Sequence, residues 1–501
     1  MAAARWRSGQ PDQGTTVIAS DLETDRTTWN HQPTGGDRPR VVVVGGGLAG
    51  LAAAAAVRDA GLAVQLVEGR RQCGGRAASF ADATDGSLVD ACQHVAMGCC
   101  TNFLELCCEA GIGPLVRRDR TLWFIGPDGR RAACTPAAWL PAPLHLAPLL
   151  LGMRHFSLRE RLALAVGMLR LAAWRPTPDS GPEPTAADWL AARQPERVIQ
   201  LFWQPVIESA LGESIDLVGI TAVKKVAVDG FLAHPTAADL WVPTRPLGDL
   251  FGERLVGWLG ERGVTIRTGR QVTAIEREAK GRATGVRCGA ELVAADAVVL
   301  AVPWRAAARL VPDLLPPVDE AFAGSPITAV HLWFDRPVID LPHAVLVGRV
   351  SQWVFQGDQT SDDSQATAEQ GHHCQVVISA SRGLCGGDRE HLLNTVVAEL
   401  REIFPGARDA RLLRSRIVTD PTAVLSVRPG VDQVRPQTST QVPNLFLAGD
   451  WVATGWPSTM EGAVRSGRQA AAAVAASLGR KPRVLTADLP KNPLVRLLVR
   501  S

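Results

Sequence analysis

A glycine-rich turn between two apolar strands constrains the fold of this chain more than any other feature. Residues 40–68 read RVVVVGGGLAGLAAAAAVRDAGLAVQLVE, with four valines before the turn, an alanine-rich helix after it and a second strand ending at Glu68. Gly45 permits the tight turn, Gly47 lets a pyrophosphate approach the backbone, and Gly50 lets the helix pack closely on the sheet. The pattern predicts a βαβ unit that binds a dinucleotide.

The ligand contacts of this unit follow from its backbone. The helix that opens at Leu48 and Ala49 aims its first N–H groups at the phosphates, because these groups have no partner inside the helix. Glu68, at the end of the second strand, would bind the ribose hydroxyls. The glycine pattern alone does not distinguish NAD from FAD.

A second motif, E-x-x-x-x-x-G-G-R from Glu68 to Arg76, follows at once. It resembles the flavoprotein superfamily of amine oxidases, phytoene desaturases and related enzymes. The resemblance implies that Gly74 and Gly75 let a loop close over the diphosphate of FAD, and that Arg76 offers it a planar set of donors. It also implies an α/β fold, with a Rossmann-like FAD-binding domain of the GR2 type and an interleaved α+β substrate domain.

Residues 442–479 resemble the last flavin-binding segment of the same superfamily, with the sequence VPNLFLAGDWVATGWPSTMEGAVRSGRQAAAAVAASLG. By resemblance, Gly449 and Asp450 lie at the ribitol or phosphate end of FAD, and Asp450 bonds it. The pyrimidine ring would face the first turn of a helix that contains Met460, Glu461 and Ala463. A helix N-terminus suits that place, because reduced flavin carries negative charge near N1.

The middle of the chain resembles the superfamily's central segment, where backbone groups near Val272 would meet the adenine. FAD is expected to be bound without a covalent link, because no cysteine or histidine adjoins the C-terminal motif. The sequence contains one strand-glycine-helix pattern, and AGIGPL at 110–115 lacks the third glycine. We therefore expect no separate nicotinamide site, and an external electron donor.

The flavin motifs divide the chain into interleaved parts. The predicted FAD-binding domain comprises residues 40–90, 245–305 and 438–479. The predicted substrate domain comprises residues 91–244, mainly helical, and residues 306–437, rich in strands. The two ends are predicted to be a disordered N-terminal extension, 1–39, and a basic C-terminal tail, 480–501.

Composition excludes some functions. The chain has 53 basic and 50 acidic residues, and a net charge of +3 gives no sign of nucleic-acid binding. Its ten cysteines contain no C-x-x-C pair, so we predict no metal site; the doublets in MGCCTNFLELCCEAG suit a buried helix. The sequence has no tyrosine, so an aromatic cage around the flavin could not use one.

Two segments suggest contact with a membrane. Residues 137–153 are apolar except for His145, but three prolines exclude a spanning helix. They are either packed internally or form an apolar mouth on a membrane. The C-terminal tail carries six basic residues and one acid from Gly479 onward, which suits an anionic surface or a solvated tail. We predict a cytoplasmic protein with peripheral contact at the inner membrane face.

The resemblance becomes more specific in LVDACQHVAMGCC, WLPAPLHLAPLLL and FWQPVIESALGESIDLVGITAVKKVAVDGFL. These segments resemble the squalene-associated FAD-dependent desaturases, or hydroxysqualene dehydroxylases, and the likeness spans residues 40–475. It implies reduction of hydroxysqualene, an apolar isoprenoid, to squalene in hopanoid or triterpene biosynthesis, beside other squalene-synthesis enzymes. Cys92 stands where many members have glycine. The alternatives are a carotenoid desaturase or isomerase, a flavin amine oxidase, and an FAD-bearing scaffold without turnover.

Two titratable residues are candidates for catalysis. His94 and Asp90 form the adjacent titratable pair in a segment that the superfamily places near the flavin. Loss of a hydroxyl needs a proton donor, and a histidine held charged by a neighbouring carboxylate would supply one. The alternative is that His94 is a structural residue in an apolar stretch.

Overall fold

The computed structural model describes residues 38–82, 86–176, 181–279, 281–357 and 371–499. The predicted N-terminal extension, 1–39, therefore lies outside the described residues except for Arg38 and Pro39.

A five-stranded parallel sheet carries the cofactor-binding motifs, in the order β10-β2-β1-β14-β20. Its strands are β1 (Arg40–Val44), β2 (Ala63–Val67), β10 (Thr265–Arg267), β14 (Ala297–Leu300) and β20 (Leu445–Leu447). They come from three distant parts of the chain, as the interleaved arrangement requires. The four valines of β1 are buried, because Val41 and Val43 pack under helices on one face of the sheet, and Val42 and Val44 pack under a small antiparallel sheet and a short helix on the other.

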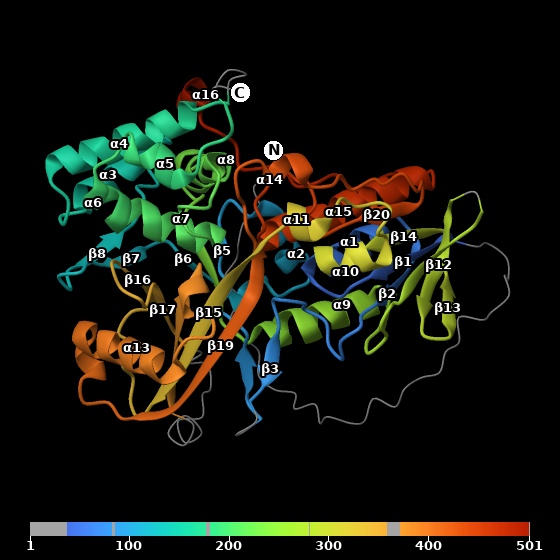
Figure 1. Ribbon diagram of the computed structural model, residues 1–501, viewed down its shortest axis with the longest axis horizontal. Helices are drawn as coiled ribbons and strands as arrows, with labels where there is room; N and C mark the ends of the chain where they lie inside the picture. The colour runs from blue at the N-terminus through green and yellow to red at the C-terminus, as the bar shows by residue number, and fades with distance from the viewer. Residues whose placement is uncertain (1–37, 83–85, 177–180, 280, 358–370, 500–501) are drawn as a thin grey trace. The chain divides into compact units, whose positions relative to one another are not determined.

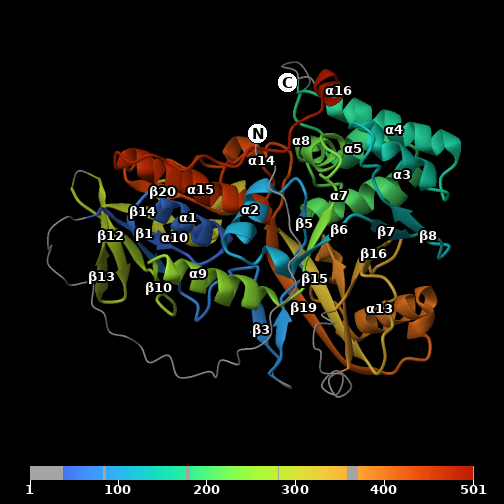
Figure 2. The same cartoon turned by 180° about the vertical axis from the view of Figure 1, so that it is seen from behind.

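Helices α1 (Leu48–Asp59) and α15 (Met460–Ser477) pack against each other on one face of this sheet. A Cβ on Gly467 of α15 would lie 2.1 Å from the carbonyl oxygen of Ala49, so only glycine allows this close approach. Figures 1 and 2 show α9 (Leu255–Glu261) beside α1, and its Leu255 and Leu259 belong to the same hydrophobic cluster as α1 and α15. The predicted start of α15 is observed, with Thr459 accepting a hydrogen bond from the Gly462 N–H as N-cap.

Three small antiparallel sheets extend the sheet region. The first contains β11 (Ala274–Arg277), β12 (Ala283–Cys288) and β13 (Glu291–Ala294). The second contains β3 (Ser79–Ala81) and β4 (Leu88–Asp90). The third contains β5 (Ala96–Met97), β9 (Leu240–Pro243) and β6 (Val116–Asp119).

A seven-stranded mixed sheet forms the second large layer, in the order β19-β15-β18-β17-β16-β7-β8. Its strands are β7 (Leu122–Ile125), β8 (Arg131–Cys134), β15 (Gly324–Phe334), β16 (His343–Leu346), β17 (Trp353–Gln356), β18 (His372–Ile378) and β19 (Leu412–Leu425). Helix α13 (Arg389–Ile403) packs on it through an apolar stripe that includes Leu392, Val396 and Leu400. Both predicted inserts therefore contribute strands to one sheet.

The first insert is also helical, as predicted. Its helices are α3 (Ala147–Gly152), α4 (Leu158–Ala173), α5 (Ala186–Ala191), α6 (Glu196–Val198), α7 (Gln204–Leu211) and α8 (Ile220–Lys225). Three π-helical turns continue or precede these and later helices, namely η3 (Ile199–Trp203), η4 (Val226–Leu232) and η5 (Gly248–Arg254). The remaining helical segments are η1 (Gly113–Leu115), η2 (Leu144–Leu146), α10 (Trp304–Leu310), α11 (Val318–Ala321), η6 (Ser381–Leu384), η7 (Pro405–Ala407), α14 (Val431–Val434) and α16 (Pro493–Leu498).

Helix α2 (Thr101–Glu109) lies within the predicted substrate domain in sequence but packs with the cofactor sheet. Phe103, Leu106 and Cys107 belong to the same hydrophobic cluster as the alanines of α1 and the apolar face of α15. Cys107 is buried as a small apolar side chain, whereas Cys108 is exposed. All ten cysteines are free thiols. The spacing of 103, 106 and 107 on one helix face explains which side is buried.

The C-terminal tail is docked on the protein rather than extended. Arg483 forms an ion pair with Glu109 of α2, and Lys491 Nζ lies 3.2 Å from Asp229 Oδ1. Val495 of α16 is buried, and α16 packs against α4. The sequence analysis expected these two basic residues to face an anionic surface. In the structure, carboxylates of the protein itself neutralise them. No helix in the described part of the chain is long and apolar enough to cross a membrane.

Candidate functional site

A cavity of about 680 Å³ lies at the carboxyl ends of β1 and β2, the edge where parallel sheets bind nucleotides. Most of the predicted cofactor residues line it: Gly45, Gly47, Leu48, Ala49, Glu68, Gly74, Gly75, Arg76, Val272, Gly449, Asp450, Met460 and Ala463. We call it the cofactor cavity. Segments separated by about 400 residues in the sequence thus meet around one space.

The three glycines of the first motif serve different purposes: Gly45 and Gly50 leave no room for a side chain, whereas Gly47 exposes bare backbone to the cavity. Gly45 has a φ of +105°, and a Cβ there would lie 2.3 Å from the oxygen of Ala301. A Cβ on Gly50 would lie 1.8 Å from the oxygen of Gly45, so this glycine permits the helix to start against the turn. A Cβ on Gly47 would face open cavity, with only the Cα of Gly75 at 3.9 Å. Bare backbone at Gly47 is the surface that a diphosphate needs.

The Glu68 carboxylate is held at the mouth of this cavity. Its Oε2 accepts a hydrogen bond from the Gly46 N–H at 2.6 Å, and its Oε1 accepts one from the Arg70 N–H at 2.7 Å. Each carboxylate oxygen retains a lone pair for a further donor. The geometry fits recognition of ribose hydroxyls.

Arg76 and Asp450 form an ion pair between the second and last flavin motifs. Arg76 Nη2 donates to Asp450, Arg76 Nη1 donates to the Ala423 oxygen at 2.9 Å, and Ser458 donates to the other Asp450 oxygen. Burial would raise the pKa of Asp450, but the Arg76 charge and these hydrogen bonds bring it below its usual value. Two nitrogens of Arg76 therefore donate hydrogen bonds within the protein, whereas the sequence analysis expected the guanidinium to bind the diphosphate.

Glu461 differs from the expectation that it contacts the flavin. Its carboxylate is fully buried and accepts hydrogen bonds from the Phe103 N–H at 2.8 Å and the Asn102 N–H at 3.1 Å, while Arg465 Nε donates to it at 2.6 Å. The first N–H groups of a helix lack partners within it, so a carboxylate there stabilises α2. Glu461 thus joins α15 to α2. It lines a second cavity, described next, and does not line the cofactor cavity.

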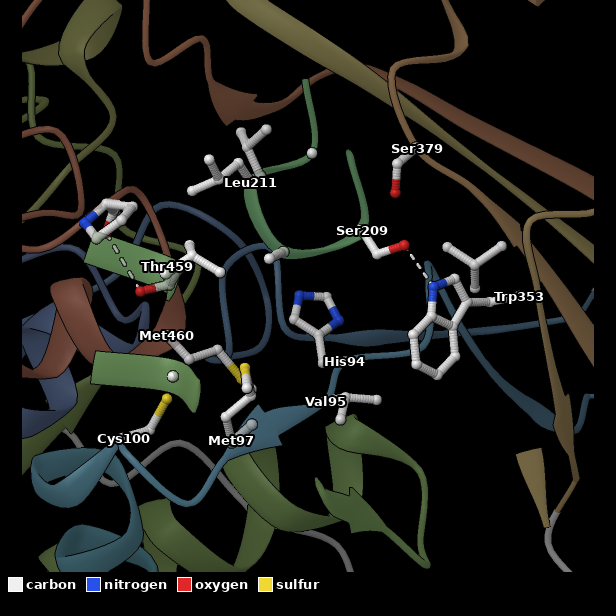
Figure 3. Close-up of a pocket in the computed structure, with 18 of the residues that line it drawn as sticks. His94, Val95, Met97, Cys100, Ser209, Leu211, Trp353, Ser379, Thr459 and Met460 are labelled. Carbon is white, nitrogen blue, oxygen red and sulfur yellow. Dashed lines mark hydrogen bonds between the residues drawn. The ribbon is translucent and has the colours of Figure 1, made fainter. Parts of the chain in front are cut away.

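A second cavity of about 320 Å³, which we call the apolar cavity, adjoins the first. Its apolar lining includes Val95, Met97, Leu122, Phe124, Val206, Leu211, Ile327, Val345, Phe355 and Val377. The two cavities share Arg76, His94, Ala423, Val424, Ser458, Thr459 and Met460. Figure 3 shows His94 standing in this space between Met460 and Trp353. A bound apolar molecule would therefore meet the cofactor beside His94.

The surroundings of His94 favour its neutral form. Its Nδ1 donates a hydrogen bond to the Cys92 oxygen at 2.9 Å, which leaves Nε2 without that proton. Burial lowers the pKa of His94, and the Arg76 charge lowers it further, although the bond to Cys92 acts in the other direction. The ring therefore takes up a proton only below the usual pH for histidine.

Asp90 does not join His94, contrary to the sequence analysis. It lies opposite Ser79 in the β3–β4 pair, and its Oδ1 accepts hydrogen bonds from Ser79 Oγ at 2.5 Å and the Leu247 N–H at 2.9 Å. Burial raises the pKa of Asp90 to about 6. The strand directs this side chain toward Ser79, and the turn that follows carries His94 away to the cavities. Asp90 is thus a structural residue that lines neither cavity.

The sequence analysis named Arg76, His94 and Glu461 but did not find three further polar residues of the apolar cavity. Ser209, Trp353 and Ser379 line it from three separate elements or their ends. No motif marks them, because single serines and tryptophans are common and their directions depend on packing. Trp456 also lines this cavity. It could have been predicted from the sequence, because it lies two residues before Ser458 in the C-terminal flavin-binding segment.

Comparison with known proteins agrees with this geometry. Residues 48–475 match the family described as flavin containing amine oxidoreductase. The chain is 25% identical over 462 residues to 15-cis-phytoene desaturase of Synechococcus elongatus, covering 87% of this chain and 96% of that protein. It is 29% identical over 469 residues to hydroxysqualene dehydroxylase of Rhodopseudomonas palustris, covering 87% and 98%.

The fold is shared with solved structures. Cyclohexylamine oxidase from Brevibacterium oxydans superposes with a TM-score of 0.64 at 20% identity, covering 89% of this chain and 100% of that chain. The predicted α/β fold with a Rossmann-like FAD-binding domain is therefore confirmed, and so is the FAD cofactor. The chain belongs to the flavin containing amine oxidoreductase family and is an FAD-dependent oxidoreductase.

Proposed function

We propose that this protein reductively removes the hydroxyl group of hydroxysqualene to give squalene and water. The observation that carries the proposal is the apolar cavity, which meets the cofactor cavity at His94 and Met460. A long hydrocarbon is bound by burying its surface, and this lining offers mainly aliphatic and aromatic side chains. The likeness to a hydroxysqualene dehydroxylase over nearly its whole length supports the choice of substrate.

The proposed reaction requires the protein to supply a proton to the oxygen that leaves the reacting carbon. FAD, when reduced, supplies a hydride. The carbon–oxygen bond breaks with its electron pair on oxygen, a carbon–hydrogen bond forms, and a proton converts the departing hydroxide to water. His94 at the junction is placed to donate that proton. Burial makes its protonated form less common but a stronger acid.

A carotenoid desaturase is the second candidate, and the 25% identity to a 15-cis-phytoene desaturase supports it. That reaction would use the same frame and apolar cavity with oxidised flavin, and it would need no departing oxygen. An amine oxidase is less well supported. The ring of Trp456 already has the Lys225 ammonium 4.4 Å and the Arg465 guanidinium 4.7 Å from its centroid. It is therefore not open to an alkylammonium substrate.

Product analysis separates these candidates. The purified FAD-loaded protein, photoreduced without oxygen, is incubated with hydroxysqualene, and the oxidised protein is incubated with phytoene. We expect squalene in the first reaction, with deuterium from labelled flavin N5 at the carbon that carried the hydroxyl. Hydroxysqualene left unchanged, together with lengthened conjugation in phytoene, would replace this proposal by the desaturase.

The electron donor is proposed to be external, either a partner reductase or a freely exchanging reductant. The support is the single dinucleotide-binding pattern in the sequence, which the FAD itself requires. Mixing the oxidised protein with NADPH alone should reduce the flavin slowly and without saturation. Rapid, saturable reduction by NADPH would show a nicotinamide site in this chain.

We further propose peripheral contact with the cytoplasmic face of a membrane through η2, α3, α4 and α16. Helix α3 contacts both η2 and α4, and α4 contacts α16. The exposed apolar side chains of these elements and of the segment before η2 are Trp139, Leu144, Leu151, Leu158, Leu162, Leu494 and Leu497. Exposed arginines of the same region are Arg154, Arg159, Arg170 and Arg496. Apolar side chains among arginines suit an anionic bilayer. His145 of η2 donates a hydrogen bond from Nε2 to the oxygen of Phe231, a residue that lines the apolar cavity.

Vesicle sedimentation tests this surface. We expect the double variant Leu158→Ser, Leu162→Ser to bind vesicles of phosphatidylcholine with phosphatidylserine less than the parent protein does. Binding should weaken with salt, at roughly 1 kcal/mol for each arginine near the lipid. Leu292→Ser, at an exposed leucine on β13, is the control. Equal sedimentation of all three proteins would exclude this face.

A further inference from the structure

Three of the polar residues that line the apolar cavity form a group away from its junction with the cofactor cavity; Gln93, Lys225, Asp229, Asp420 and Glu461 also line the apolar cavity alone. Ser209 of α7, Trp353 of β17 and Ser379 directly after β18 line the apolar cavity and do not line the cofactor cavity. In Figure 3 they lie on the far side of His94 from Thr459 and Met460. A molecule between His94 and this wall would have the cofactor on one side and these polar groups on the other.

The hydroxyl of Ser379 has no hydrogen-bond partner among the described residues. Ser379 is 5% exposed, and Figure 3 shows its oxygen directed into the cavity toward Ser209. Because this hydroxyl opens onto the cavity, its hydrogen bonds come from whatever fills the cavity, either water or a ligand. In a wall that is mainly apolar, such a group is available to bond a polar group of a bound ligand.

The backbone around Ser379 is held in place by neighbouring groups. Gln352 Oε1 accepts from the Ser379 N–H at 2.7 Å, and Gln352 Nε2 donates to the Ser379 oxygen at 3.3 Å and to Glu208 at 3.4 Å. The next residue, Ala380, has a φ of +52°, the one positive value at a non-glycine position in the described part of the chain. Such strain persists where the surrounding structure enforces it, often at functional sites. The backbone that carries Ser379 is therefore held at the cavity wall.

Ser209 completes the polar wall. Its hydroxyl donates to the Pro205 oxygen and accepts from Trp353 Nε1. Its donor is therefore used, and one lone pair remains to accept a hydrogen bond. Ser379 can donate and Ser209 can accept, which is the pairing that an alcohol group requires. A pure hydrocarbon would satisfy neither serine.

We propose that Ser379 and Ser209 form a subsite that binds the hydroxyl group of an isoprenoid alcohol. This inference rests on the proposed function and deepens it, because it says how the alcohol is distinguished from hydrocarbons of the same length. The subsite directs the oxygen away from the cofactor, so the carbon that carries it faces the hydride donor. The Ser379 hydroxyl also stabilises charge on the oxygen as its bond to carbon breaks. Squalene has no such group and is released more readily.

Binding to the oxidised, FAD-loaded protein tests the subsite without turnover. Hydroxysqualene and squalene are titrated in detergent micelles, and the change in flavin absorbance gives each Kd. We expect Ser379→Ala to weaken hydroxysqualene binding roughly tenfold, the effect of one hydrogen bond, and to leave squalene binding unchanged. Val377→Ala is the matched control, because it removes apolar contact from the same wall and should weaken both ligands equally. FAD content shows that each variant is folded.

Trp353→Phe provides a second variant, since it keeps the aromatic surface but removes the N–H that orients Ser209. It should weaken hydroxysqualene binding less than Ser379→Ala does. Equal weakening of alcohol and hydrocarbon in Ser379→Ala, or no change in either, would overturn the subsite even if the parent enzyme makes squalene. Selective weakening in a protein that makes no squalene would support the subsite and reject only the proposed reaction.

Discussion

The cofactor cavity and the apolar cavity share part of a wall but are made in different ways. The cofactor cavity is formed mainly by short glycine-containing turns and helix starts, in which backbone groups face the ligand. The apolar cavity is formed by side chains from strands, α7 and the π-helical turn η4. We therefore expect the flavin site to tolerate few changes at its glycines, whereas individual side chains of the apolar cavity should be replaceable without loss of FAD.

The largest expected effect tests the backbone character of the cofactor cavity. Gly47→Val should abolish FAD binding, because the new side chain would extend into the cavity where we expect the diphosphate to lie. The measurement is the flavin absorbance that remains with the protein after desalting. Gly260→Val, at a helix position with no atom within 4 Å, should keep its flavin. Full occupancy in the Gly47 variant would place the diphosphate elsewhere.

The next effect concerns the junction of the two cavities. His94→Ala should keep FAD and lower turnover of hydroxysqualene by roughly a hundredfold, the usual scale for loss of a general acid. His391→Ala, on the exposed surface of α13, is the matched control and should turn over normally. Stopped-flow oxidation of the reduced flavin by substrate measures the step directly. Unchanged turnover would make His94 a structural residue.

The pH dependence of the same step gives a smaller effect with a definite sign. Burial lowers the pKa of His94, so its protonated fraction grows only as the pH falls below the usual histidine range. At neutral pH and above, kcat/KM should fall about tenfold for each unit of pH increase. The same dependence should be missing in His94→Ala. A profile that rises with pH would assign His94 the role of a base.

The smallest effect on catalysis is expected at Asp90, which lies outside both cavities. Asp90→Asn keeps the acceptor for Ser79 and Leu247, so turnover and its pH profile should change by less than about twofold. Stability should change instead. The folded-state pKa of about 6 lies above the ordinary value of 3.8, so the contribution of Asp90 is present below about pH 4 and is lost as the pH rises through 6.

Urea unfolding of the FAD-loaded protein measures this change. At pH 7.5 the asparagine variant should gain up to about 3 kcal/mol, because it no longer buries a charge, and at acid pH the gain should shrink. A large loss of turnover in Asp90→Asn with unchanged stability would restore the Asp90–His94 pair that the sequence suggested.

Much of the cofactor cavity could be predicted from the sequence. Gly45 and Gly50 are required by contacts within one turn, and Glu68 follows from the length of the second strand. The pairing of Arg76 with Asp450 could not be predicted, because it joins motifs 374 residues apart and needs both side-chain directions. The same reason hid the role of Glu461, whose partners on α2 come from a segment that the sequence analysis placed in the other domain.

The strands, the helix starts and the flavin motifs are local features, and the sequence determined them because backbone conformation and burial period act over a few residues. The directions of Asp90, Ser379 and the C-terminal tail were decided only when distant segments packed together. Asp90 faces Ser79 through strand pairing, Gln352 holds the backbone of Ser379 at the cavity wall, and Lys491 is neutralised by Asp229. Side-chain partners of this kind depend on the three-dimensional arrangement, since a few kcal/mol of desolvation or ion pairing can favour either direction.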